Sequence, residues 1–111
     1  MKHVEGVAAI LVKNGKIAAF RRNNGSFDGY YEFVGGKIEP DESKEQALIR
    51  ECKEEIDIDI TIDRYFRTIS YDYDDFRLTL HCYVCKPKSE KMRLAVHDDV
   101  VWVDTRSIES L

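Results

Sequence analysis

Residues 43–56 restrict the fold most strongly, because they are the best helix candidate in a chain whose other periodic segments are typical of strands. Ser43 and Gln46 stand three residues apart, which is the spacing of a capping box and marks the start of the helix. Apolar residues at three- and four-residue steps predict one buried stripe, made by Leu48, Ile49, Cys52 and Ile56. Other elements of the chain must cover this stripe.

The remaining segments predict a sheet. Asn14 and Gly15 separate two apolar runs and predict a β-hairpin, since both residue types accept the positive φ of a type I′ turn. A short strand is expected at 30–34, followed by irregular backbone at Gly35 and Gly36. Further strands are predicted at 58–62, 65–71, 76–85 and 100–103. A hairpin, a helix and then mostly strands indicate the α+β class.

Acidic residues gather on the predicted helix. Glu51, Glu54 and Glu55 are spaced i, i+3 and i+4, so their carboxylates converge on one patch of its surface. Such oxygen ligands suit Mg²⁺ or Mn²⁺, with waters and substrate phosphates completing the octahedron. Arg50 can hold a neighbouring carboxylate in a two-pronged hydrogen bond. The alternative is a solvated acidic face, which composition alone favours for Glu54 and Glu55.

The segment 36–58 resembles the signature of the Nudix hydrolases, G-x5-E-x7-R-E-U-x-E-E-x-G-U, where U is a bulky aliphatic residue. The positions that match in register are Gly36, Glu42, Arg50, Glu51, Glu54, Glu55 and Ile58. Cys52 and Asp57 depart from the pattern. Cys52 is a small hydrophobe, and Asp57 replaces a helix-ending glycine with a residue type that tolerates the left-handed conformation. We therefore expect a slightly different helix exit and an intact metal site.

The resemblance extends from the first strands to Trp102 and looks closest to the MutT-like nucleoside triphosphate pyrophosphohydrolases. Residues 31–37, Tyr-Glu-Phe-Val-Gly-Gly-Lys, are similar to that group's W/L-E-F-P-G-G-K. The resemblance implies an α+β Nudix fold, a mixed sheet packed between helices in an α/β/α sandwich. It also implies a metal centre, whose ligands would be Gly35 through its carbonyl, Glu51, Glu54, Glu55 and, from the acids before Trp102, Asp98.

The same resemblance implies the roles of further residues. Glu42 and Arg50 support the catalytic site, and Glu51 is our preferred base for the attacking water, with Glu42 or an acid of 97–99 as alternatives. In-line attack then releases pyrophosphate. Substrate contacts are implied for Arg22 (or Arg21 in its place), Phe33, Gly36, Lys37 and Phe76.

The implied activity is Mg²⁺-dependent hydrolysis of a nucleoside triphosphate to the monophosphate and pyrophosphate, with Mn²⁺ as an alternative metal. A related nucleoside diphosphate-linked compound is the alternative substrate. The expected role is sanitation of the nucleotide pool, against 8-oxo-dGTP or (d)CTP, and residues 71–85 look more like the CTP type. One alternative is a catalytically weak Nudix domain that binds a nucleotide and regulates a partner. Another is a plain acidic scaffold domain. The oligomeric state stays open, with a homodimer among the alternatives.

Composition supports one domain over residues 1–111, because 43% hydrophobic residues suffice for one core. The net charge of −4 provides no field for a nucleic-acid polymer. No apolar run approaches the roughly 18 residues that cross a bilayer, and Glu5 stands where a signal peptide would be apolar, so a cytoplasmic protein with no membrane partner is expected. Residues 105–111 begin as a helix would and then stop, so the C-terminal helix looks truncated.

The cysteines and histidines are assigned no ligand role. Three cysteines make no disulfide framework and suit a reducing compartment. Cys82 and Cys85 have a zinc-like spacing, but residues three apart on a strand point to opposite faces. His81 and His97 are expected to be packed or solvated.

Overall fold

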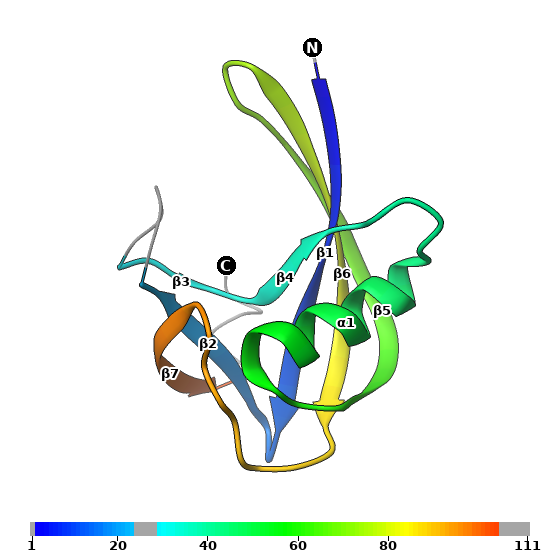
Figure 1. Cartoon of the computed structure of the whole chain (residues 1–111). Helices are drawn as coiled ribbons and strands as arrows, with labels where there is room; N and C mark the ends of the chain where they lie inside the picture. The colour runs from blue at the N-terminus through cyan, green and yellow to red at the C-terminus, as the bar shows by residue number, and fades with distance from the viewer. Residues whose placement is uncertain (1, 24–28, 105–111) are drawn as a thin grey trace.

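The structure is a computed structural model that describes residues 2–23 and 29–104 (Figure 1). Its elements are, in chain order, β1 (Lys2–Lys13), β2 (Lys16–Arg22), β3 (Tyr31–Glu32), β4 (Val34–Lys37), α1 (Lys44–Ile56), β5 (Ile60–Asp72), β6 (Phe76–Pro87) and β7 (His97–Asp104). Among these residues no helix is long and apolar enough to cross a membrane.

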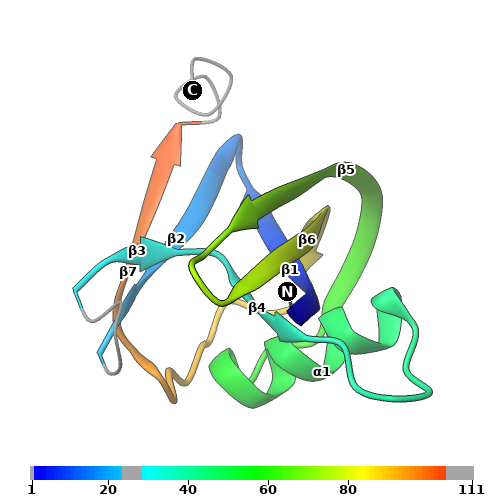
Figure 2. The same ribbon diagram turned by 90° about the horizontal axis from the view of Figure 1, so that it is seen from above.

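The strands form one mixed sheet with the order β3-β2-β1-β6-β5, in which β4 pairs with β1 and β7 pairs with β2. The long β1–β6 pair is parallel and the other pairs are antiparallel. Figures 1 and 2 show α1 on one side of this sheet, close to β4 and β1. The α+β class with a mixed sheet is thus confirmed. The further helix expected in residues 105–111 lies outside the described residues.

The core lies between α1 and the sheet. Its buried members from α1 are Ala47, Leu48, Cys52 and Ile56, and they pack on apolar residues of β1, β2, β4 and β6. A smaller apolar cluster occupies the opposite face of the sheet around Ala8, Ile10 and Cys82. Cys85 belongs to the first cluster, so the prediction that Cys82 and Cys85 point to opposite faces is confirmed.

Helix α1 begins as the sequence predicts, and Asp57 at its end adopts the left-handed conformation that its residue type tolerates. Ser43 is the N-cap, and its side chain and that of Gln46 form the reciprocal hydrogen bonds of a capping box. Asp57 ends the helix in the left-handed conformation, with φ 56°, and its N–H reaches the carbonyls of Cys52 and Lys53. The prediction of a buried Ile49 is wrong, because its side chain lies at the edge of the apolar stripe and is 47% exposed.

The hairpin prediction is confirmed, with positive φ at Asn14 and Gly15 between β1 and β2. The expected irregular backbone at Gly35 and Gly36 is wrong. Both glycines lie inside β4, opposite Ala8 and Val7 of β1, and neither has a positive φ. The two strands expected at 58–62 and 65–71 are one strand, β5, interrupted by register shifts in its pairing with β6.

Candidate functional site

The candidate site is built where β4 passes beside α1. A Cβ atom added at Gly36 would stand 2.6 Å from Oε1 of Glu51, so any larger residue would displace this carboxylate. A Cβ atom added at Gly35 would stand 2.0 Å from the carbonyl oxygen of Val7 on β1. The two glycines therefore serve close approach, of β4 to β1 on one side and of a helix carboxylate to the β4 backbone on the other.

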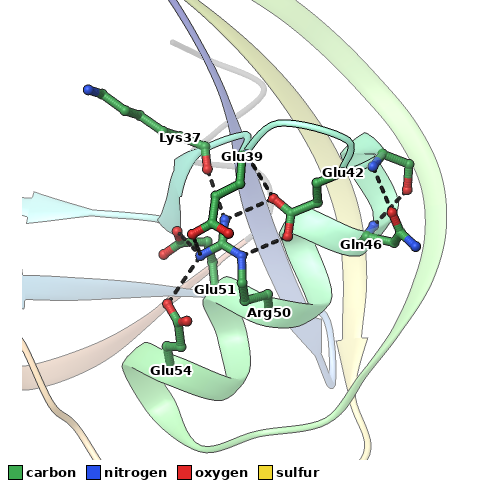
Figure 3. Close-up of polar contacts among 8 residues, drawn as sticks. Lys37, Glu39, Glu42, Gln46, Arg50, Glu51 and Glu54 are labelled. Carbon is green, nitrogen blue, oxygen red and sulfur yellow. Dashed lines mark hydrogen bonds and ion pairs between the residues drawn. The ribbon is translucent and has the colours of Figure 1, made fainter.

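Four glutamates surround Arg50 and form with it what we call the Arg50 cluster (Figure 3). The guanidinium binds Glu42 through two hydrogen bonds, from Nε at 2.7 Å and from Nη2 at 3.0 Å. Nη1 donates to Glu51 at 2.8 Å and to Glu54 at 3.1 Å, and Glu39 lies 3.6 Å away. The predicted two-pronged hydrogen bond of Arg50 is thus confirmed, with Glu42 as its partner.

Arg50 changes the basicity of Glu42. Hydrogen bonds from Arg50, and one from the backbone N–H of Glu39, lower the pKa of Glu42 to about 2. The hydrogen bonds that Arg50 donates to Glu42 and Glu51 raise the pKa of Arg50 further above its ordinary value. Glu42 is therefore a poor acceptor for a proton from water, and its position fits a support that holds Arg50 against Glu51.

A second group of titratable residues lies deeper, and we call it the buried cluster: Glu32, Glu55 and His97. One ligand atom from each residue lies within 4.8 Å of those of the other two. Oε1 of Glu55 and Nδ1 of His97 are buried and have no hydrogen-bond partner. The carboxylate of Glu32 accepts hydrogen bonds from His97 and Arg22, both at 2.9 Å.

Burial and the neighbouring carboxylate of Glu51 raise the pKa of Glu55 well above its usual range. Such a pair of close acids binds either a proton or a cation. Oε1 of Glu55 is a buried carboxylate oxygen without a partner, and the carboxylate of Glu51 and the two glycines of β4 lie beside it. Mg²⁺ and Mn²⁺ prefer hard oxygen ligands of this kind. The residues present therefore fit a divalent cation.

The spacing of the acids predicts one convergent patch, and in the structure its three acids differ in exposure. Glu51 and Glu55 face β4 and are shielded, whereas the side chain of Glu54 is 59% exposed. Glu51 and Glu54 share Nη1 of Arg50. Residues at i and i+4 share a helix face, and the sheet covers only the face that carries Glu51 and Glu55.

A cleft of about 520 Å³ opens beside the two glycines. Its lining includes the predicted substrate residues Arg22, Phe33, Gly36 and Lys37, together with Glu32 of the buried cluster. Leu78 and Leu80 line its apolar side. Four of the five predicted substrate contacts are thus brought together in one cleft.

The other predicted site residues lie elsewhere. Phe76 is the first residue of β6, two residues before Leu78. Its ring stacks on that of Tyr73, with 4.7 Å between the ring centroids, and it is not part of the cleft lining. Asp98 accepts a hydrogen bond from Nε of Arg21 at 2.6 Å and has no described contact with the helix glutamates. Arg22, rather than Arg21, lines the cleft.

Sequence reasoning missed Glu32 and His97 as members of the site. Glu32 stands in the motif at 31–37, so its position was visible, but its partners were not. His97 lies 65 residues from Glu32 in the chain, and no local pattern marks their contact. Leu78 and Leu80 could have been found, because alternation along β6 puts them on the same face as Phe76.

Comparisons with known proteins agree with this geometry. The family model described as NUDIX domain matches residues 2–110. The chain is 37% identical to the CTP pyrophosphohydrolase of Escherichia coli K12 over 103 residues, which is 92% of this chain and 76% of that protein. It is 45% identical to the 8-oxo-dGTP diphosphatase of Proteus vulgaris over 56 residues, half of each protein.

Solved structures show the same arrangement of elements. The solution structure of the E. coli ORF135 protein superimposes with a TM-score of 0.81 at 34% identity, covering 96% of this chain and 77% of that one. A MutT protein from Methanosarcina mazei Go1 superimposes with a TM-score of 0.86 at 21% identity, covering 99% and 83%. The second likeness supports the fold alone.

Proposed function

The chain belongs to the Nudix family, and from this premise we propose that it hydrolyses nucleoside triphosphates to the monophosphate and pyrophosphate with Mg²⁺ as its cofactor. The observation that carries the proposal is the juxtaposition of Glu51 and Glu55 with the glycines of β4, next to a cleft that contains Arg22 and Lys37. The glycines of β4 thus line the cleft together with basic groups for phosphates, and a carboxylate for a cation lies against them.

The proposed metal ligands are Glu51, Glu54, Glu55 and the carbonyl of Gly35, with Mn²⁺ as the alternative ion. When bound, the cation would neutralise phosphate charge and make a bound water more acidic. Glu54 would have to turn from Arg50, which its exposure permits. To act as a further ligand, Asp98 would have to leave Arg21, with which its carboxylate is paired.

We propose Glu51 as the group that accepts the proton of the attacking water. Glu42 is the less suitable base because Arg50 keeps its pKa at about 2. Asp99 accepts a hydrogen bond from the hydroxyl of Tyr31 at 2.8 Å and is occupied there. Arg50 holds Glu51 by one hydrogen bond and Glu42 by two, so it fixes the base relative to its support.

The cleft supplies the proposed substrate contacts. Arg22 and Lys37 would bind phosphate oxygens, and Gly36 lets them approach the β4 backbone without a side chain in the way. Phe33, with Leu78 and Leu80, would form the apolar surface that contacts the nucleobase of the substrate. Phe76 is a lesser candidate, since it packs on Tyr73 outside the cleft.

The substrate proposed first is CTP or dCTP, because the relative that spans 92% of this chain is a CTP pyrophosphohydrolase. The second is 8-oxo-dGTP, named in a relative that matches half of the chain. Both belong to sanitation of the nucleotide pool. We propose the cytoplasm as its compartment, supported by three cysteines that are all free.

The test is a panel of nucleoside triphosphates incubated with Mg²⁺, with the products separated. We expect the monophosphate and pyrophosphate in equal amounts, at the highest kcat/KM for CTP, dCTP or 8-oxo-dGTP. Release of inorganic phosphate and a nucleoside diphosphate would show cleavage between the β and γ phosphates and would contradict the proposed reaction. No turnover of any member would leave the regulatory Nudix domain as the better explanation.

A further inference from the structure

His97 is buried in a place where the proposed reaction gives it no role. It is the first residue of β7, its side chain is fully buried, and its Nε2 lies 2.9 Å from Oε2 of Glu32. Nη1 of Arg22 lies 2.9 Å from the same oxygen. One carboxylate oxygen thus joins a buried imidazole to a guanidinium that lines the cleft.

We propose that His97 is a positioning residue for Arg22: it donates its Nε2–H to Glu32, and the carboxylate held in this way aims the guanidinium at the substrate phosphates. The inference rests on the proposed function, because a nucleoside triphosphate gives Arg22 its anionic partner. His97 itself has no place in the cleft lining.

An irregularity in the sheet supports this role. In the β2–β7 pair Arg21 stands opposite Asp99 and Arg22 stands opposite His97, so the register shifts between the two arginines and passes over Asp98. Without the shift Arg22 would stand opposite Asp98. Cross-strand partners share a face of the sheet, and bulges redirect side chains. The shift therefore places His97 beside Arg22, while Asp98 pairs with Arg21.

The hydrogen-bond partners decide which nitrogen carries the proton. Nδ1 of His97 is buried without a partner, so a proton there would be a buried donor with no acceptor. A proton on Nε2 is donated to Glu32 and leaves only a lone pair unmatched on Nδ1. The geometry therefore assigns the Nε2–H tautomer.

The same argument separates positioning from metal ligation. Glu32, Glu55 and His97 lie close enough to share an ion. Ligation through Nε2 would move the imidazole proton to Nδ1, where the structure offers no acceptor. We therefore place His97 behind Glu32, and the cation with the helix glutamates.

Three substitutions separate the donor from the ring. His97→Gln places an amide N–H near the position of Nε2, whereas His97→Asn places it near Nδ1. His97→Phe keeps a ring that can pack on Phe20, whose centroid lies 5.4 Å from that of His97, but has no donor. The Gln and Asn variants carry the test if the Phe variant does not fold, since they differ by one methylene group.

The first readout is the affinity for α,β-methylene-CTP, measured by calorimetry in the presence of Mg²⁺. In this analogue a methylene group replaces the oxygen between the α and β phosphorus atoms, so the bond that the proposed reaction breaks is not cleaved. We expect His97→Gln to bind within about threefold of the parent, and His97→Asn and His97→Phe to bind about tenfold more weakly, as for loss of one charge-assisted hydrogen bond. In an Arg22→Ala background, His97→Phe should cause no further loss. Equal affinities for all variants, or an undiminished effect without Arg22, would overturn the proposal.

The second readout is independent of the substrate. In protein labelled with ¹⁵N-histidine, the resonances missing from the His97→Gln spectrum belong to His97. We expect a protonated Nε2 and a bare Nδ1, unchanged by Mg²⁺. A proton on Nδ1 of His97, or loss of the Nε2 proton when Mg²⁺ is added, would show that His97 binds the metal ion and does not position Arg22.

The two readouts also separate failure of this inference from failure of the proposed function. A parent protein that binds no analogue and releases no pyrophosphate would refute the proposed function and the phosphate role of Arg22 with it. A parent that binds and turns over, but shows no coupling between His97 and Arg22, would refute only the role of His97.

Discussion

The Arg50 cluster and the buried cluster lie on neighbouring sides of the same site, yet their charges are satisfied differently. Around Arg50, Glu42, Glu51 and Glu54 each accept a hydrogen bond from one guanidinium. In the buried cluster, Glu55 has an oxygen without any partner and sits beside two further carboxylates. The carboxylates around Arg50 have a donor as soon as the chain folds, whereas the unpartnered oxygen of Glu55 gains by binding a cation. The comparison teaches that acids three or four residues apart on a helix can have unlike roles.

The largest effect that follows from this difference is on turnover. Glu55→Gln removes a proposed metal ligand, and because a metal stabilises the transition state by several kcal/mol, kcat/KM should fall by about 10²- to 10⁴-fold. The measurement is pyrophosphate release from CTP at saturating Mg²⁺. Glu45→Gln, an exposed change in the first turn of α1, is the matched control and should leave the rate unchanged. A rate within about threefold of the parent would remove Glu55 from the metal site.

The next effect is on folding, and it concerns the Arg50 cluster. Arg50→Met leaves Glu42 and Glu51, which are largely shielded, without their common donor. The free energy of unfolding should drop by about 1–3 kcal/mol in a urea titration. Arg77→Met breaks an exposed pair with Asp72 and should lower the free energy of unfolding by much less, because solvent screens that pair. Equal losses for the two variants would show that the Arg50 cluster is no more than a surface ion pair.

A third effect concerns pH in the absence of metal. The pKa of Glu55 is raised from 4.5 to about 8, so the folded state binds a proton more tightly than the unfolded state. This stabilisation is complete below about pH 4.5 and is lost as the pH rises through 8. Thermal unfolding in EDTA should show the parent losing stability over this range relative to Glu55→Gln. Added Mg²⁺ should remove the difference, and parallel curves without metal would contradict the account.

The smallest effect is the mirror image, at Glu42. Its pKa falls from 4.5 to about 2, so its contribution is present above pH 4.5 and is lost as the pH falls towards 2. The stability difference between the parent and Glu42→Gln should therefore narrow over that interval. The measurement is a series of urea titrations between pH 5 and pH 2. A difference that stays constant would mean that Arg50 does not stabilise the Glu42 anion.

Local patterns predicted much of the fold and the signature part of the site. The capping box of Ser43 and the left-handed Asp57 were found because caps depend on residues within one helical turn. The pairing of Arg50 with Glu42 follows a fixed spacing across the helix start. Such contacts are encoded over a few residues, so one sequence suffices to see them.

Long-range register was beyond the same reasoning. The register shift that places Arg22 opposite His97 depends on how β7 pairs with β2, and no local pattern in the sequence of either strand predicts it. The conformation of Gly35 and Gly36 in β4 was predicted wrongly for a related reason. A glycine pair is typical both of irregular backbone and of a strand that another group approaches closely, and only the contacts with Val7 and Glu51 distinguish the two. The buried cluster was therefore visible only in three dimensions.

The central claim is that Glu55 is a ligand of a divalent cation, and Mn²⁺ binding without nucleotide tests it most directly. In a titration followed by electron paramagnetic resonance, the signal of free Mn²⁺ should decrease in the parent and in Glu45→Gln at the same concentrations. In Glu55→Gln the same decrease should need at least about tenfold more protein, as expected when a charged ligand is lost. Equal binding by the parent and Glu55→Gln, or no binding by the parent, would contradict the account.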